Sequence, residues 1–123
     1  MPAQIVIVHD DEAFLLAATD ALKEAGHSVA PFNDPMAALD VLAEARTVQL
    51  LITRVEFAPG KPHGVALARM ARLKLPGIKV LFTALPQYAE HAEGLGAFLP
   101  TPVDVADLVA VVERLLEASD RPI

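Results

Sequence analysis

Short apolar runs alternate along the whole chain with segments whose apolar residues repeat at helical spacing. The apolar runs are typical of buried strands and cover residues 5–8, 27–32, 48–54, 78–83 and 97–99. The segments between and after them predict helices over residues 11–25, 35–45, 64–73, 86–94 and 104–118. In the first of these helices Phe14, Ala18 and Leu22 keep the core spacing, whereas Leu15 and Leu16 fall partly outside it, which predicts exposed apolar surface.

Local signals mark the ends of these helices. Gly26 follows the first helix as a stop, Asp34 precedes the second as an N-cap, and Asp104 precedes the last. Five strands with short connections and a helix after each predict an α/β protein of the (βα)5 type. This is a doubly wound, five-stranded parallel sheet of the flavodoxin-like kind. We expect a single domain over residues 1–123 with a core from about 4 to 118, and a frayed tail over 119–123.

Composition narrows the class of protein. The chain has 123 residues, of which 54% are hydrophobic and 21% charged, so it can bury a core without disulfides or metals. It has no cysteine, which excludes disulfides and thiolate metal sites. A net charge of −6 argues against nucleic-acid binding. The longest apolar stretches, such as 108–112, are too short to cross a bilayer and no signal segment opens the chain, so we expect a cytoplasmic protein that does not bind membranes.

The third strand ends in a charged residue, Arg54, and runs into a loop rich in proline and glycine over residues 58–64. In open α/β sheets, functional groups collect at the carboxyl ends of the strands. The first strand also ends in polar residues there, with His9, Asp10 and Asp11 in succession. The sequence therefore predicts a polar site at this edge that contains a guanidinium.

Several segments in order resemble the response-regulator receiver domain, the CheY-like module of two-component signalling that is phosphorylated on an aspartate. They are residues 8–12, the third strand with its loop, residues 81–84 and residues 96–102. The resemblance covers residues 5 to about 116. It implies a pocket in which two acids after the first strand and an acceptor aspartate after the third hold Mg²⁺. A Ser or Thr after the fourth strand and a Lys after the fifth would contact the phosphoryl group.

On this resemblance Asp10 and Thr83 match the family pattern. His9 stands in place of an acid, Arg54 in place of the acceptor, and Thr101 in place of the lysine.

Two further positions belong to the comparison with the family. Phe98 matches the aromatic residue on the fifth strand that follows the threonine inward when a receiver switches. Asp11 is expected to cap the first helix, although another register would pair Asp10 with Asp11 as the two acids.

The summed charge of the pocket side chains argues against a bound metal ion. The family pocket has three carboxylates and one lysine, whereas here the charges of Asp10 and Arg54 cancel and His9 is mostly neutral near pH 7. A guanidinium about 4 Å from Mg²⁺ repels it by several kcal/mol at an effective dielectric constant of about 20. We therefore expect an Asp10–Arg54 ion pair, no metal and no cofactor.

These observations predict a degenerate, stand-alone receiver that acts by binding proteins without being phosphorylated, and not an enzyme. The alternative is a phosphorelay receiver with another acceptor, such as Glu56 or Asp11. A nucleotide-binding enzyme would need a glycine-rich loop after the first strand, where residues 10–13 are Asp-Asp-Glu-Ala.

Expected partners are signalling proteins: a histidine kinase, a phosphotransfer protein or a downstream regulator, with a homodimer as a further possibility. By the same resemblance, the partner surface is expected around the fourth helix and fifth strand. Its predicted residues are Leu85, Tyr88, Phe98 and Val103.

Overall fold

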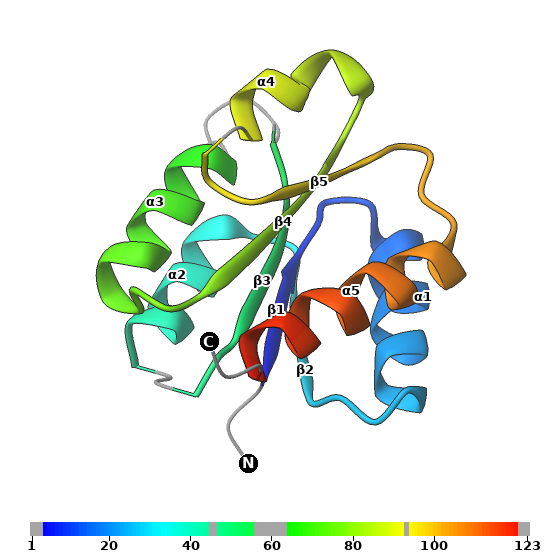
Figure 1. Ribbon diagram of the computed structural model, residues 1–123, viewed down its shortest axis with the longest axis horizontal. Helices are drawn as coiled ribbons and strands as arrows, with labels where there is room; N and C mark the ends of the chain where they lie inside the picture. The colour runs from blue at the N-terminus through cyan, green and yellow to red at the C-terminus, as the bar shows by residue number, and fades with distance from the viewer. Residues whose placement is uncertain (1–3, 45–46, 56–63, 93, 121–123) are drawn as a thin grey trace.

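The computed structural model describes residues 4–44, 47–55, 64–92 and 94–120. Within these ranges a 5-stranded parallel sheet has the order β2-β1-β3-β4-β5, so that β2 and β5 form its edges (Figure 1). The strands are β1 (Ile5–Val8), β2 (Val29–Phe32), β3 (Leu50–Arg54), β4 (Lys79–Ala84) and β5 (Ala97–Pro100). The helices are α1 (Glu12–Glu24), α2 (Pro35–Glu44), α3 (Gly64–Lys74), α4 (Ala89–Ala92) and α5 (Val105–Asp120), with a 3₁₀ turn η1 (Pro86–Tyr88) before α4.

The predicted (βα)5 fold is confirmed, and its boundaries differ at a few places. The second strand begins at Val29 and not at residue 27, because Gly26 and His27 complete the end of α1. Gly26 has φ 99° and donates its N–H to the carbonyl of Lys23 at 3.0 Å, while His27 donates to the carbonyl of Leu22 at 3.1 Å. This pair of bonds is the Schellman arrangement, which needs a left-handed residue after the helix.

Two other boundaries were predicted wrongly. The third strand begins at Leu50, two residues later than predicted. The last helix continues to Asp120, so the predicted frayed tail is wrong for residues 119 and 120, and residues 121–123 lie outside the described ranges. No proline or glycine stands between Val105 and Asp120 to interrupt the i→i−4 hydrogen bonds of this helix.

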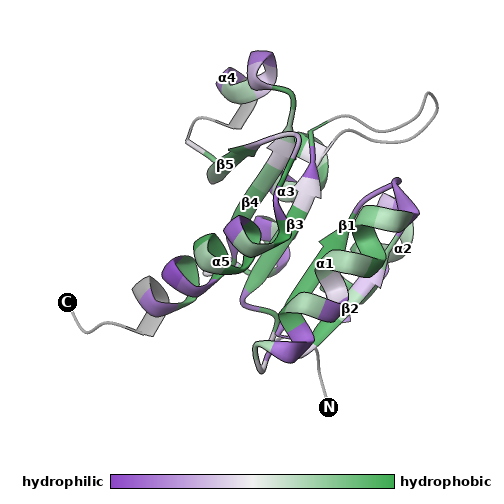
Figure 2. Cartoon of the chain, turned by 90° about the vertical axis from the view of Figure 1, so that its right-hand side faces the viewer, coloured by the Kyte–Doolittle hydropathy of each residue, from purple (hydrophilic) through white to green (hydrophobic). Residues whose placement is uncertain are grey.

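Helices cover both faces of the sheet. One apolar cluster joins β1, β3 and β4 to α2 and α3, and includes Val6, Leu42, Leu67 and Phe82. The other joins the opposite face of the sheet to α1 and α5, and includes Ile7, Leu22 and Leu108. Figure 2 shows the central strands as the most hydrophobic part of the chain. In the part of the chain that the structure describes, every helix is too short or too polar to cross a bilayer.

The start of α3 is pressed against the end of β3. A Cβ atom built on Gly64 would lie 1.6 Å from the carbonyl oxygen of Arg54, a separation that no side chain can occupy. The backbone N–H of Gly64 also donates to the carbonyl of Val55 at 2.8 Å. Glycine is therefore required here because of a close approach between two backbones. The contact fixes the backbone that carries Arg54.

We predict that Gly64→Ala lowers the free energy of unfolding by at least about 2 kcal/mol, because the new methyl group forces α3 away from β3. Gly77→Ala is the matched control, since a Cβ built there meets nothing within 4 Å. That control is expected to change stability by no more than about 1 kcal/mol. Urea unfolding of both variants measures the difference, and equal stability would show that α3 can shift without cost.

Candidate functional site

The polar residues predicted from the sequence gather at the carboxyl edge of the sheet. β1 pairs with β3 and β3 pairs with β4, in a register that sets Val8 beside Thr53 and Arg54 beside Thr83. The residues that follow β1 therefore lie next to the last residue of β3. Arg54 is the end of β3, and about a third of its side chain is exposed.

Asp10 and Arg54 form the predicted ion pair. Nη1 of Arg54 donates to Oδ1 of Asp10 at 2.6 Å, a short charge-assisted hydrogen bond. Burial by itself raises the pKa of Asp10, but the hydrogen bond and the charge of Arg54 outweigh it, so the pKa of this carboxyl lies below its ordinary value of 3.8. Asp10 is therefore ionised at neutral pH and its charge is matched by Arg54.

His9 is buried and neutral. Its Nδ1 accepts the backbone N–H of Asp11 at 3.0 Å, which assigns the ring hydrogen to Nε2. The ring also packs against Phe14, with centroids 4.6 Å apart. Burial, followed by the charge of Arg54, lowers the pKa of His9 from 6.5 to about 4, although the carboxylates of Asp10 and Asp11 oppose the shift. At neutral pH the 3.9 Å approach of Nδ1 to Asp10 is thus not an ion pair.

Asp11 is the N-cap of α1, as predicted. Its Oδ1 accepts the backbone N–H of Phe14 at 3.2 Å, and its side chain is exposed. One oxygen of this carboxylate is therefore committed to the helix. This geometry favours the register in which Asp10 alone faces Arg54, over the register that pairs Asp10 with Asp11.

Thr83 and Thr101 occupy different surroundings. Thr83 is fully buried, and its hydroxyl has no hydrogen-bond partner among the described residues; the same holds for Nε of Arg54 beside it. Thr101 is half-buried, is joined to Pro102 by a cis peptide bond and donates its N–H to the carbonyl of Ala84 at 2.8 Å.

The Thr101 side chain lines a cavity of about 230 Å³. The residues around this cavity are His9, Asp11, Phe14, Thr101, Pro102 and Val103. The structure thus divides the candidate residues into an Asp10–Arg54 pair beside Thr83 and a His9–Thr101 cavity. The sequence pattern treated Phe14 only as a core position, and no sequence signal pointed to its contact with His9.

The predicted partner residues lie on two faces of the sheet. Phe98 pairs in register with Phe82 and packs, like Tyr88, against the cluster that contains α2 and α3. Leu85 is 47% exposed before η1. Val103 packs instead against the cluster on the α1 and α5 side. The structure therefore places Tyr88 and Phe98 against the same cluster and Val103 against the other, while Glu56, the other predicted acceptor, lies outside the described residues.

We predict that the Asp10–Arg54 pair stabilises the fold by coupling β1 to β3. Asp10→Ala is expected to lower the free energy of unfolding by about 1–2 kcal/mol, because it leaves a partly buried guanidinium without its partner. A double-mutant cycle with Arg54→Ala measures the coupling in urea, expected at about 1 kcal/mol. The exposed Asp40→Ala serves as control. A coupling energy of zero at pH 7 would contradict this prediction.

We predict a pH dependence from His9. Because folding lowers its pKa from 6.5 to about 4, the unfolded chain binds the proton more tightly, so stability is full above pH 6.5 and falls as the pH drops towards 4. The loss attributable to His9 between pH 7 and 4.5 is about 2–3 kcal/mol. His9→Asn keeps an acceptor for the Asp11 N–H and does not titrate. Urea unfolding between pH 7 and 4.5 gives the free energy of unfolding at each pH. This free energy should fall less steeply with decreasing pH for His9→Asn than for the wild type, and equal slopes would refute the prediction.

Comparison with known proteins agrees with this architecture. No family model matches the chain. The solved receiver domain of the hybrid histidine kinase CckA is 31% identical, with a TM-score of 0.77 over 91% of this chain and 97% of that domain. A response regulator receiver protein from Sinorhizobium medicae has a TM-score of 0.84 over 97% of this chain and 98% of its own, at 23% identity, which shows the fold alone.

The curated sensor kinase CckA of Brucella abortus is 27% identical over 126 residues. The match covers 96% of this chain but only 13% of the kinase, so the chain corresponds to one part of that larger protein. The identity to the CckA receiver over nearly its full length, together with the five-stranded parallel fold, assigns the family. The chain belongs to the response-regulator receiver domains of two-component signalling.

Proposed function

We propose that this receiver domain acts by binding other signalling proteins without being phosphorylated. The observation that supports the proposal is Arg54 at the end of β3, with its guanidinium bonded to Asp10 at 2.6 Å. The resemblance to working receivers puts the acceptor carboxylate at this position. A guanidinium stays protonated in proteins and has no lone pair with which to attack a phosphoryl donor.

The residues present do not fit the Mg²⁺ that the receiver fold implies. Arg54 holds the carboxylate of Asp10, and Asp11 caps α1 through one of its oxygens. His9 offers no carboxylate, and its Nδ1 already accepts a backbone N–H. A hard divalent cation prefers several oxygen ligands of negative charge, whereas the paired charges here sum to zero. No step of the proposed function therefore involves a metal.

In this proposal the Asp10–Arg54 ion pair takes the place of the phosphorylation-dependent conformational change of a working receiver. Thr83 lies beside Arg54, and its buried hydroxyl makes no hydrogen bond to Arg54 or to any other described residue. Phe98, the aromatic residue that would follow it, packs against the cluster on the α2 and α3 side. We infer that the domain keeps one conformation and that its output is a constitutive protein contact.

The proposed contact surface contains Leu85, Tyr88 and Phe98. The exposed Leu85 and the partly buried Tyr88 belong to the segment that leads from β4 into η1, and Phe98 lies on the edge strand β5. An edge strand and an exposed leucine in one region are features of interaction surfaces. The partners proposed are a histidine kinase, a phosphotransfer protein or a downstream regulator, and a second copy of the chain is an alternative at the same surface.

We predict that the wild-type chain gains no phosphate from acetyl phosphate with Mg²⁺, whereas the triple variant His9→Asp, Arg54→Asp, Thr101→Lys does. The triple variant restores the acids and the cation on a scaffold that keeps Asp10, Thr83 and Phe98. Arg54→Asp alone is expected to label poorly, because His9 supplies no carboxylate and Thr101 no positive charge.

Intact-protein mass spectrometry measures the labelling, and Asp10→Asn in the triple variant is the control that removes a metal ligand. Labelling of the wild type at the level of the triple variant would overturn the proposal. If peptide mapping then placed the phosphate on Asp11 or Glu56, the chain would be a phosphorelay receiver with a different acceptor.

A further inference from the structure

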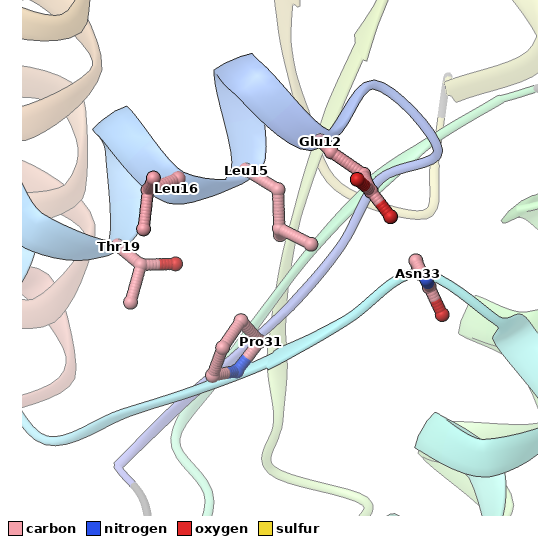
Figure 3. Close-up of a pocket in the computed structure, with 6 residues that line it drawn as sticks. All are labelled: Glu12, Leu15, Leu16, Thr19, Pro31 and Asn33. Atoms are coloured by element: carbon pink, nitrogen blue, oxygen red, sulfur yellow. The ribbon is translucent and has the colours of Figure 1, made fainter.

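An apolar groove runs between α1 and the edge strand β2, away from the Asp10–Arg54 pair. It has a volume of about 280 Å³ and is lined by Glu12, Leu15, Leu16, Thr19, Pro31 and Asn33 (Figure 3). Leu16 is 65% exposed, although Ala18 and Leu22 on the same helix are completely buried. An exposed leucine beside a groove with apolar walls offers a place for an apolar side chain of another molecule.

Thr19 gives the groove an unused polar group. Its side chain is only 4% exposed, and its hydroxyl has no hydrogen-bond partner among the described residues. Figure 3 shows this hydroxyl turned from α1 towards the space above Pro31. A buried hydroxyl without a partner is costly, and in native proteins such a group calls for an explanation.

The elements that form this groove carry an excess of negative charge. Residues 1–33, which include β1, α1 and β2, contain 5 acidic residues and one basic residue, Lys23, for a net charge of 1 − 5 = −4. Helix α2 lies on the opposite face of the sheet, so its acids are not counted here. Residues 34–123 contain 9 basic and 11 acidic residues, for a net charge of 9 − 11 = −2. The carboxylate of Glu12 is exposed on the rim of the groove. A field of one sign around an apolar groove attracts partners of the opposite charge.

We propose that the α1–β2 groove binds a basic amphipathic helix of a partner protein. One apolar side chain of that helix enters between Leu16 and Pro31, and a neighbouring lysine or arginine pairs with Glu12. A helix is favoured over an added strand because Pro31 lies in the edge strand and has no N–H to donate. The groove shares no residue with the Asp10–Arg54 pair, so this inference stands apart from the proposed absence of phosphorylation.

A second copy of the chain is a poorer occupant. The helix α3 does carry basic residues and Leu73, which is 82% exposed. However, two copies each carry a net charge of −6 and repel one another. A separate basic partner gains attraction from the same charge that disfavours self-association.

The test titrates a synthetic amphipathic helix of leucine and lysine into the isotopically labelled chain and records ¹H–¹⁵N correlation spectra. Two control peptides replace every lysine by glutamate or every leucine by alanine. We expect saturable shifts of the amide signals in α1 and β2, weakened by added salt, from the leucine–lysine peptide alone. Shifts confined to α4 and β5, or equal binding of either control peptide, would overturn the proposal.

Variants of the chain locate the contact. Leu16→Ala is expected to raise the Kd by about fivefold or more, and Glu12→Gln by about twofold with a smaller dependence on salt. Leu73→Ala is the matched control, since it removes a leucine that is even more exposed, on α3. It is expected to leave the Kd unchanged. Equal effects of Leu16→Ala and Leu73→Ala would overturn the proposal, as would self-association without peptide that Leu16→Ala abolishes.

Discussion

The ion pair between Asp10 and Arg54 is the contact around which the carboxyl edge of the sheet is arranged. It joins the residue after β1 to the last residue of β3 at 2.6 Å, and both side chains are about one-third exposed. Water therefore screens the pair only in part. Behind it, Gly64 holds α3 against the Arg54 carbonyl, so the backbone that supplies the guanidinium has little freedom.

The guanidinium of Arg54 also affects the protonation of the neighbouring His9. Its charge adds to burial in lowering the pKa of His9 to about 4, so the ring is neutral and accepts the Asp11 N–H. Asp11 in turn starts α1 by capping it. The segment from His9 to Asp11 is thus used for hydrogen bonds within the chain. Among the described residues, no group of three or more histidine, aspartate or glutamate side chains is placed to hold a metal ion.

Charge is distributed unevenly between the two halves of the domain. Residues 1–33, which include β1, α1 and β2, carry a net charge of −4 out of the total of −6, whereas the charges of Asp10 and Arg54 cancel. Long-range attraction is therefore expected to act through the α1–β2 side and not through the pocket. The negative charge on this side lies next to the exposed Leu16 and the α1–β2 groove. A basic partner can therefore be attracted by charge first and then make apolar contact.

The sequence by itself determined the alternation of strands and helices, the cap at Asp11 and the Asp10–Arg54 pair, because these depend on local patterns and on the rule that parallel strands end at one edge. Only the tertiary structure decided that His9 is buried against Phe14, that Thr101 lines a cavity while Thr83 is fully buried, and that Val103 lies across the sheet from Phe98. Only it showed the groove between Leu16 and Pro31. Each of these depends on which distant segments meet and on the space left between their side chains, which periodicity along one segment does not encode.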